Sequence, residues 1–143
     1  MAGGATDAAV VERLAALALF ADASAAELEA IAHLVEERQF AGGERILRQG
    51  LSGSGFYLIL DGEATIRVDG TDYGTLGRGD FFGEISALLG EPPVADVVAK
   101  PGLRCAIVSR PELEGFLTGH PRVLYRMLQA EARKLRAATR WRG

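Results

Sequence analysis

The stretch that decides the fold is FGEISALLGEPPVADV, residues 82–97. A glycine and a carboxylate, Gly83 and Glu84, open a short helical segment, which two prolines and a β-rich run follow. The first N–H groups of a helix have no partner within the helix and carry partial positive charge. Gly83 has no Cβ, so a ligand can lie directly on its backbone. The stretch therefore predicts a short helix that begins at an anion-binding pocket.

Hydrophobic periodicity divides the chain into three parts. Helical spacing extends over about residues 8–37, where Ser24 and Glu27 form a candidate capping box. Residues 38–109 contain short β-rich runs at 56–60, 64–68, 94–99 and 103–108, separated by Gly, Asp and Pro turns. Helical spacing returns over 111–141, with a break before Pro121. We predict an α+β fold in a single domain, residues 1–143: a β-roll (a jelly-roll-like antiparallel barrel) flanked by N-terminal and C-terminal helices.

Composition fits one globular domain. The chain has 143 residues and is 48% hydrophobic, which suffices for one core. It has no apolar run of about 18 residues, so we expect no membrane span. It has no basic region at its start, so we expect no secretory signal and a cytoplasmic location. The single cysteine, Cys105, has no partner for an internal disulfide and is expected to be a buried strand residue.

Four stretches in order, residues 17–34, 40–50, 55–63 and 79–84, give the chain a family resemblance. Together they resemble the cyclic nucleotide-binding domain, the sensor module of catabolite-activator-type (Crp/Fnr-like) regulators, protein kinase A regulatory subunits and nucleotide-gated channels. The resemblance implies a regulatory signalling domain that binds cAMP or cGMP. It also implies that Glu84 accepts a hydrogen bond from a ribose 2′-hydroxyl. The alternative role for Glu84 is to stabilise the first turn of its helix.

The sequence departs from the family where an arginine would meet the cyclic phosphate. The positions of that arginine and the small residues after it read Pro93, Val94, Ala95 and Asp96. Arginine makes a bidentate, charge-assisted pair with phosphate that proline cannot make. Losing one partner of a buried charge pair costs roughly 2–5 kcal/mol, so we expect weak or lost binding of cAMP and cGMP. The candidates for a substitute cation are Arg45, Arg48, Arg78 and Arg104.

The predicted ligand site combines the two halves of this stretch. Its residues are Phe82, Gly83, Glu84, Ile85, Ser86, Ala87, Pro93, Val94, Ala95 and Asp96. Besides a weakly bound cyclic nucleotide, another small anion or a nucleoside is a candidate ligand; we expect no resident cofactor and no metal. The two histidines, His33 and His120, lie far apart, and no serine has evident His and acid partners. We therefore expect no enzymatic activity.

The C-terminal segment, residues 121–143, carries seven basic residues and one acid, a net +6, whereas the whole chain is −3. Leu124, Leu128, Leu135 and Ala138 form a seam at helical spacing. We interpret this helix as a homodimer or docking contact rather than a nucleic-acid surface, and we expect no nucleic-acid reading head in this chain. Two hypotheses stay open: a ligand-gated sensor, or a ligand-independent interaction module whose pocket is filled by side chains such as Val94.

Overall fold

A computed structural model describes the backbone of residues 2–51 and 55–142 and the side chains of residues 8–51 and 55–139. The chain begins with helix α1 (Ala2–Ala15), a 3-10 turn η1 (Ala18–Phe20) and α2 (Ala25–Leu34). It ends with α4 (Arg110–Gly119) and the long α5 (Pro121–Arg142), and α3 (Glu84–Leu89) lies between strands. None of the described helices is both long and apolar enough to cross a membrane.

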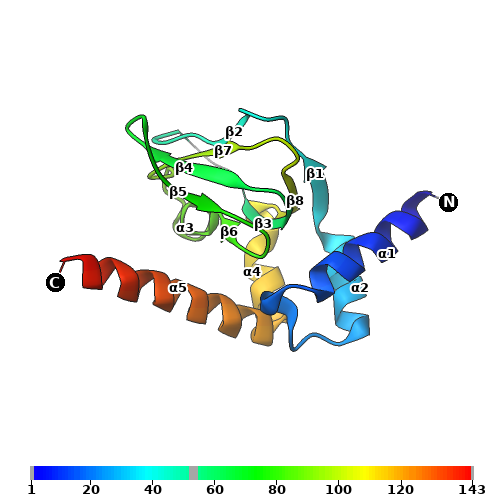
Figure 1. Cartoon of the computed structure of the whole chain (residues 1–143). Coiled ribbons are helices and arrows are strands. Elements are labelled where there is room, and N and C mark those ends of the chain that lie inside the picture. Colours follow the sequence, from blue (N-terminus) through cyan, green and yellow to red (C-terminus); the bar gives the residue numbers. More distant parts are fainter. Residues whose placement is uncertain (1, 52–54, 143) are drawn as a thin grey trace.

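Within the described residues, eight strands form two antiparallel sheets, which stack in a roll (Figure 1). One sheet has the order β1 (Glu36–Gln39), β8 (Arg104–Val108), β3 (Phe56–Asp61), β6 (Phe81–Phe82). The other has the order β2 (Arg45–Leu47), β7 (Asp96–Ala99), β4 (Ala64–Val68), β5 (Thr71–Leu76). The predicted α+β roll with flanking helices is confirmed.

The first boundary differs from the prediction, which extended the helical part to residue 37. The structure ends α2 at Leu34, Val35 is already extended with ψ 148°, and β1 begins at Glu36. The run Glu36–Gln39 is polar throughout and carries no β signal of its own. It becomes a strand because it pairs with β8, with Glu37 opposite Ala106.

Strand β3 is buried on both faces, so it belongs to two hydrophobic cores. Phe56, Leu58 and Leu60 pack with the helices in one core, which also contains Phe81. Tyr57 and Ile59 face the second core, between the sheets, together with Phe82 and Cys105. Alternate side chains of a strand point to opposite faces, which explains why residues 56–60 are all apolar or aromatic, whereas the exposed Asp61 ends the strand. Burial raises the pKa of Cys105 to about 12, as suits a structural thiol.

The helix signals are confirmed in part. Ser24 caps α2, and its Oγ accepts a hydrogen bond from the Glu27 backbone N–H at 3.1 Å. The Glu27 carboxylate, however, lies 2.8 Å from His120 Nδ1 at the junction of α4 and α5. The capping box is therefore only half formed, because Glu27 joins the N-terminal helices to the C-terminal ones.

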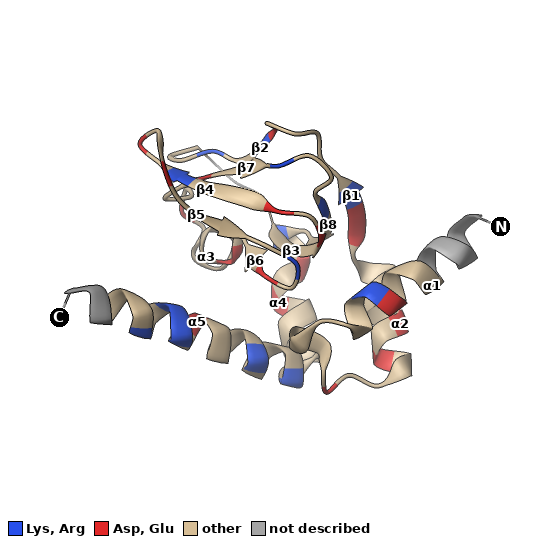
Figure 2. Ribbon diagram, in the orientation of Figure 1, with Lys and Arg blue, Asp and Glu red and all other residues tan. Residues whose placement is uncertain are grey.

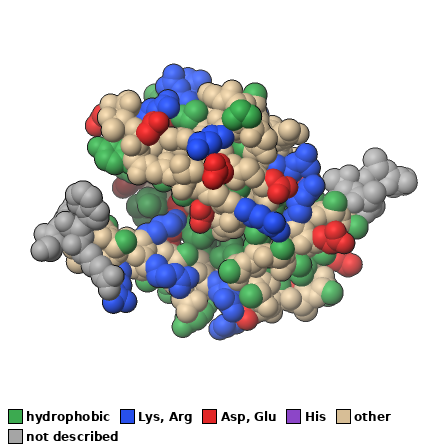
Figure 3. Space-filling view, viewed as in Figure 1, with side chains coloured by type: hydrophobic (Ala, Val, Ile, Leu, Met, Phe, Trp, Pro, Cys, Tyr) green, Lys and Arg blue, Asp and Glu red, His purple; other side chains and the backbone are tan. Residues whose placement is uncertain are grey.

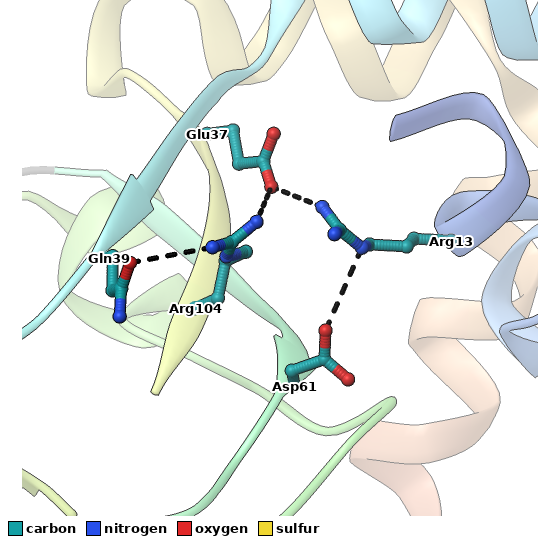
Figure 4. Close-up of polar contacts among 5 residues, drawn as sticks. All are labelled: Arg13, Glu37, Gln39, Asp61 and Arg104. Carbon is teal, nitrogen blue, oxygen red and sulfur yellow. Dashed lines mark hydrogen bonds and ion pairs between the residues drawn. The ribbon is translucent and has the colours of Figure 1, made fainter. Parts of the chain in front are cut away.

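A polar cluster attaches α1 to the first sheet (Figure 4). Glu37 Oε1 accepts hydrogen bonds from Arg13 Nη1 and, at 3.1 Å, from Arg104 Nη1. Arg13 Nε also lies 3.7 Å from Asp61 Oδ2, and Arg104 Nη2 donates to Gln39 Oε1 at 3.4 Å. The Glu37 side chain is 17% exposed and is shared by two guanidinium groups, so it holds the cluster together.

We predict that Glu37→Gln lowers the free energy of unfolding by about 1–2 kcal/mol, because the two arginines lose their shared charged acceptor. Denaturant unfolding followed by circular dichroism measures this. The matched control is Glu36→Gln at the exposed neighbouring position, expected to stay within about 0.5 kcal/mol of the wild type. Equal effects of the two substitutions would contradict the role given to Glu37.

Candidate functional site

A cavity of about 240 Å³ lies between the roll, α3 and α5. In Figure 3 the surface is hollowed between the roll and α5, and hydrophobic side chains are visible within the hollow. Strands β2, β4, β5, β6 and β7, helix α3, the loop after it and α5 all contribute to its wall. The lining residues are Leu47, Ile66, Leu76, Phe81, Phe82, Gly83, Glu84, Ile85, Ser86, Glu91, Pro92, Pro93, Val94, Ala95, Val97 and Lys134.

Eight of the ten predicted site residues line this cavity, namely Phe82, Gly83, Glu84, Ile85, Ser86, Pro93, Val94 and Ala95. Ala87 instead packs against the helical core and lines a separate groove beside α4. The Asp96 carboxylate accepts a hydrogen bond from the Gln49 backbone N–H at 2.7 Å and lies 3.9 Å from Arg45 Nη1. Asp96 therefore ties β7 to the loop after β2.

Gly83 is required by a contact within the fold. Its φ is +84°, and a Cβ built there would lie 2.5 Å from the Gly55 carbonyl oxygen and 3.1 Å from Tyr57 Cδ1. The close approach of Gly55 and Tyr57, at the start of β3, therefore requires glycine here whether or not a ligand lies on this backbone. Gly83 is the N-cap of α3, so this backbone contact sets where Glu84 enters the cavity.

The loop after α3 is held by hydrogen bonds and places proline where the resemblance puts arginine. Ser86 Oγ donates to the Glu91 carbonyl at 2.5 Å, and the Pro93 carbonyl accepts from Gly50 N–H at 2.9 Å. Pro93 is buried, whereas Val94 is 74% exposed at the cavity rim. The expectation that Val94 fills the pocket is wrong, because the loop turns its side chain toward solvent.

Glu84 is the buried charged group of the site, at 5% exposure. Its Oε2 lies 3.4 Å from Lys134 Nζ of α5. Lys134 Nζ also lies 3.1 Å from Glu131 Oε1 and 4.3 Å from the centroid of the Phe81 ring. Burial raises the pKa of Glu84 to about 7; Glu131 adds to this rise and Lys134 opposes it.

Lys134 is the cationic side chain among the described residues that line the cavity. Of the arginines considered as substitutes, Arg104 belongs to the cluster in Figure 4, Arg45 lies beside Asp96, and Arg78 lines a separate hollow near Asp80. Arg48 is not among the lining residues. Sequence reasoning missed Lys134 because it is one of several cations spaced along α5 (Figure 2), and only packing shows which one reaches Glu84.

The first half of helix α5 is held against the N-terminal helices, which fixes the direction in which α5 carries Lys134 to the cavity. Val123 and Met127 are buried in the helical core. Asp22, beside η1, accepts hydrogen bonds from Arg122 and Arg126 at 2.7–3.2 Å. Arg126, joined by Arg122, lowers the pKa of Asp22 to about 2. Beyond Glu131 every described side chain of α5 is exposed.

The sequence profile described as "Cyclic nucleotide-binding domain" matches residues 37–120, more than half of the chain. The chain belongs to this family. The matched segment contains all of α3 and the roll except Glu36, the first residue of β1. It therefore contains every predicted site residue, but it ends before Lys134.

Solved structures of cyclic nucleotide-binding domains share this fold. The Thermus thermophilus catabolite activator protein is 26% identical, with a TM-score of 0.76, over 85% of this chain and 59% of that one. The regulatory subunit of a cAMP-independent protein kinase A from Trypanosoma brucei is 28% identical, with a TM-score of 0.72, over 87% and 47%. The regulatory domain of Toxoplasma gondii protein kinase A, solved with cAMP, is 24% identical, with a TM-score of 0.75, over 91% and 52%. The chain thus spans about half the length of these proteins.

We predict that Glu84 contributes stability to this cyclic nucleotide-binding domain that is lost as pH rises from about 4.5 to about 7, and that Glu84→Gln removes this part of the pH dependence. The folded pKa of Glu84, about 7, lies above the ordinary value of 4.5. The protonated carboxyl therefore contributes stability that is complete below pH 4.5 and is lost as pH rises through 7.

Chemical denaturation of both proteins at a series of pH values measures this difference. The matched control is Glu91→Gln, which removes an exposed carboxylate from the rim of the same cavity and should leave the wild-type slope unchanged. Parallel curves for the wild type and Glu84→Gln would contradict the buried state of Glu84.

Proposed function

We propose that this chain is a regulatory domain that senses a small molecule, with weak or lost binding of cAMP and cGMP. The observation that carries the proposal is the combination of an open cavity with buried Pro93 at the phosphate position. The cavity has room for a ligand, and Glu84 supplies a buried acceptor. No guanidinium from the described residues lines the cavity to neutralise a cyclic phosphate.

The Trypanosoma brucei relative supports this separation of fold from cyclic nucleotide response. That subunit belongs to a kinase described as cAMP-independent. A triple mutant of it, in which one substitution introduces an arginine, was solved bound to cAMP in the A site. By analogy, a domain of this fold can keep its architecture while its affinity for cAMP depends on a few side chains in the pocket.

Contact between the cavity and α5 provides a route for regulation. Lys134 is on α5, and its Nζ lies 3.4 Å from Glu84 Oε2. A ligand that binds Glu84 changes the partners of Lys134. Occupancy of the cavity therefore biases the position of the distal half of α5, the part beyond Glu131. An effector attached to or contacting α5 would read this change.

We predict that Pro93→Arg increases the affinity for cAMP by ~30-fold to ~4,000-fold, the equivalent of roughly 2–5 kcal/mol for a buried charge pair. Isothermal titration of the wild type and the variant with cAMP and cGMP measures the gain. Pro93→Met is the matched control, because it replaces the proline by a long side chain without charge. Micromolar binding by the wild type, or equal gains in Arg and Met, would overturn the proposal.

A second candidate function is a ligand-independent interaction module that forms a homodimer through α5. The observation that favours it is the exposure of Leu124, Leu128 and Leu135, which are 38%, 62% and 69% exposed on one helix. Their spacing of four and seven residues is that of a coiled-coil seam. Burying such a stripe against a second copy would remove this apolar surface from water.

We predict that the wild type sediments as a dimer at micromolar concentration and that Leu128→Glu sediments as a monomer, because a carboxylate in the seam would be buried without a partner. Analytical ultracentrifugation distinguishes the two states. Gln129→Glu, an exposed charge change one position along α5, is the control and should remain a dimer. A monomeric wild type would reject this second candidate and leave the sensor proposal intact.

A further inference from the structure

The ammonium group of Lys134 occupies a site built for a cation. Glu84 Oε2 and Glu131 Oε1 lie 3.4 Å and 3.1 Å from Nζ, and the face of Phe81 lies 4.3 Å away. Two carboxylates and an aromatic face are the groups that recognise an organic ammonium ion, through charge-assisted hydrogen bonds and cation–π attraction. Glu84 and Phe81 are both 5% exposed, so two of the three groups are held rigidly by the fold.

The charges around the cavity disfavour an anion. Its lining contains Glu84 and Glu91 as acids and Lys134 as the base. Lys134 already forms ion pairs with Glu84 and Glu131, so the two carboxylates offset its attraction for a phosphate or carboxylate ligand. At the far end, where the resemblance places an arginine, Pro93 contributes no charge and no N–H donor. The acidic side chains that a ligand meets here, Glu84 and Glu91, are hydrogen-bond acceptors, which favours a ligand that carries donors.

The rest of the cavity suits an apolar body. Leu47, Ile66, Leu76, Val97 and the ring of Phe82 line it, and the volume of about 240 Å³ accommodates one small ring with a short chain. These apolar residues come from β2, β4, β5, β7 and β6, that is, from the rigid roll. The cation site and the apolar chamber adjoin, because Phe81, Glu84 and Lys134 line the same cavity.

We propose that the cavity binds a small primary amine with an apolar body, whose ammonium group takes the place of the Lys134 ammonium between Glu84 and Phe81. This ligand class rests on the proposed function of the domain as a sensor. Lys134 is then the specificity-determining residue: it is a tethered competitor that only another cation can replace without leaving Glu84 unpaired.

Displacement of Lys134 is feasible because its side chain is 51% exposed and the α5 residues around it face solvent. A released ammonium group regains its hydration, and exposed ion pairs are individually weak. Glu84, by contrast, stays buried, so its ionised form needs a cation beside it whether that cation is Lys134 or a ligand. The exchange swaps one cation for another at Glu84 and frees the distal half of α5 from the roll.

Isothermal titration with phenethylamine tests the proposal, with 2-phenylethanol as the neutral probe and 3-phenylpropionate as the anionic one. We expect the wild type to bind the amine more tightly than either of the others. Lys134→Met should bind it roughly tenfold more tightly or better, because it removes both the competitor and a like charge. Lys134→Arg, which keeps the cation, should behave as the wild type, and Glu84→Gln should lose the preference for the amine.

Equal or tighter binding of 2-phenylethanol or 3-phenylpropionate would overturn the proposal. An unchanged affinity of Lys134→Met for phenethylamine would overturn it too, because this exposed substitution does not endanger the fold. Titration of Pro93→Arg with cAMP distinguishes failure of the amine proposal from failure of the proposed sensor function. A gain of cAMP binding without any amine binding rejects the amine and leaves the sensor. Failure of both rejects this cavity as a ligand site.

Discussion

The double burial of β3 is the constraint on which the rest of the structure depends. Its odd and even side chains belong to different cores, one under the helices and one between the sheets. Because residues 56–60 have water on neither face, they are all apolar or aromatic, as expected of a strand in the interior of its sheet. Here β3 lies between β8 and β6, and the helices and the second sheet are organised around it.

The position of the cavity wall depends on this strand. Tyr57 and Leu58 pair with Phe82 and Phe81, which fixes β6 and turns one ring to each core. The Tyr57 and Phe82 rings stack with centroids 4.9 Å apart. The chain then passes so close to the start of β3 that only glycine fits at position 83. Glu84 follows directly, so the placement of the buried carboxylate is a consequence of strand packing.

A buried carboxylate needs a partner, and this requirement links the roll to α5. Desolvation makes an isolated ionised Glu84 costly, which is why its pKa rises and why Lys134 lies against it. In the distal half of α5 the described side chains are exposed, so the Lys134 contact is a main attachment of that half to the roll. Through this ion pair the buried carboxylate connects the wall of the cavity to α5.

The sequence by itself predicted the strands at 56–60, 64–68, 94–99 and 103–108, the turns between them and the break at Pro121, because periodicity and turn residues are local properties of the chain. It also places Pro93 where the resemblance puts an arginine. Only the tertiary structure decided that polar residues 36–39 form a strand and that Val94 faces solvent. It also decided that Asp96 accepts a hydrogen bond from the loop after β2 and that Lys134 pairs with Glu84. These features depend on pairings between residues distant along the chain. Burial and the partner available in space decide such pairings, and neither is written in the local pattern.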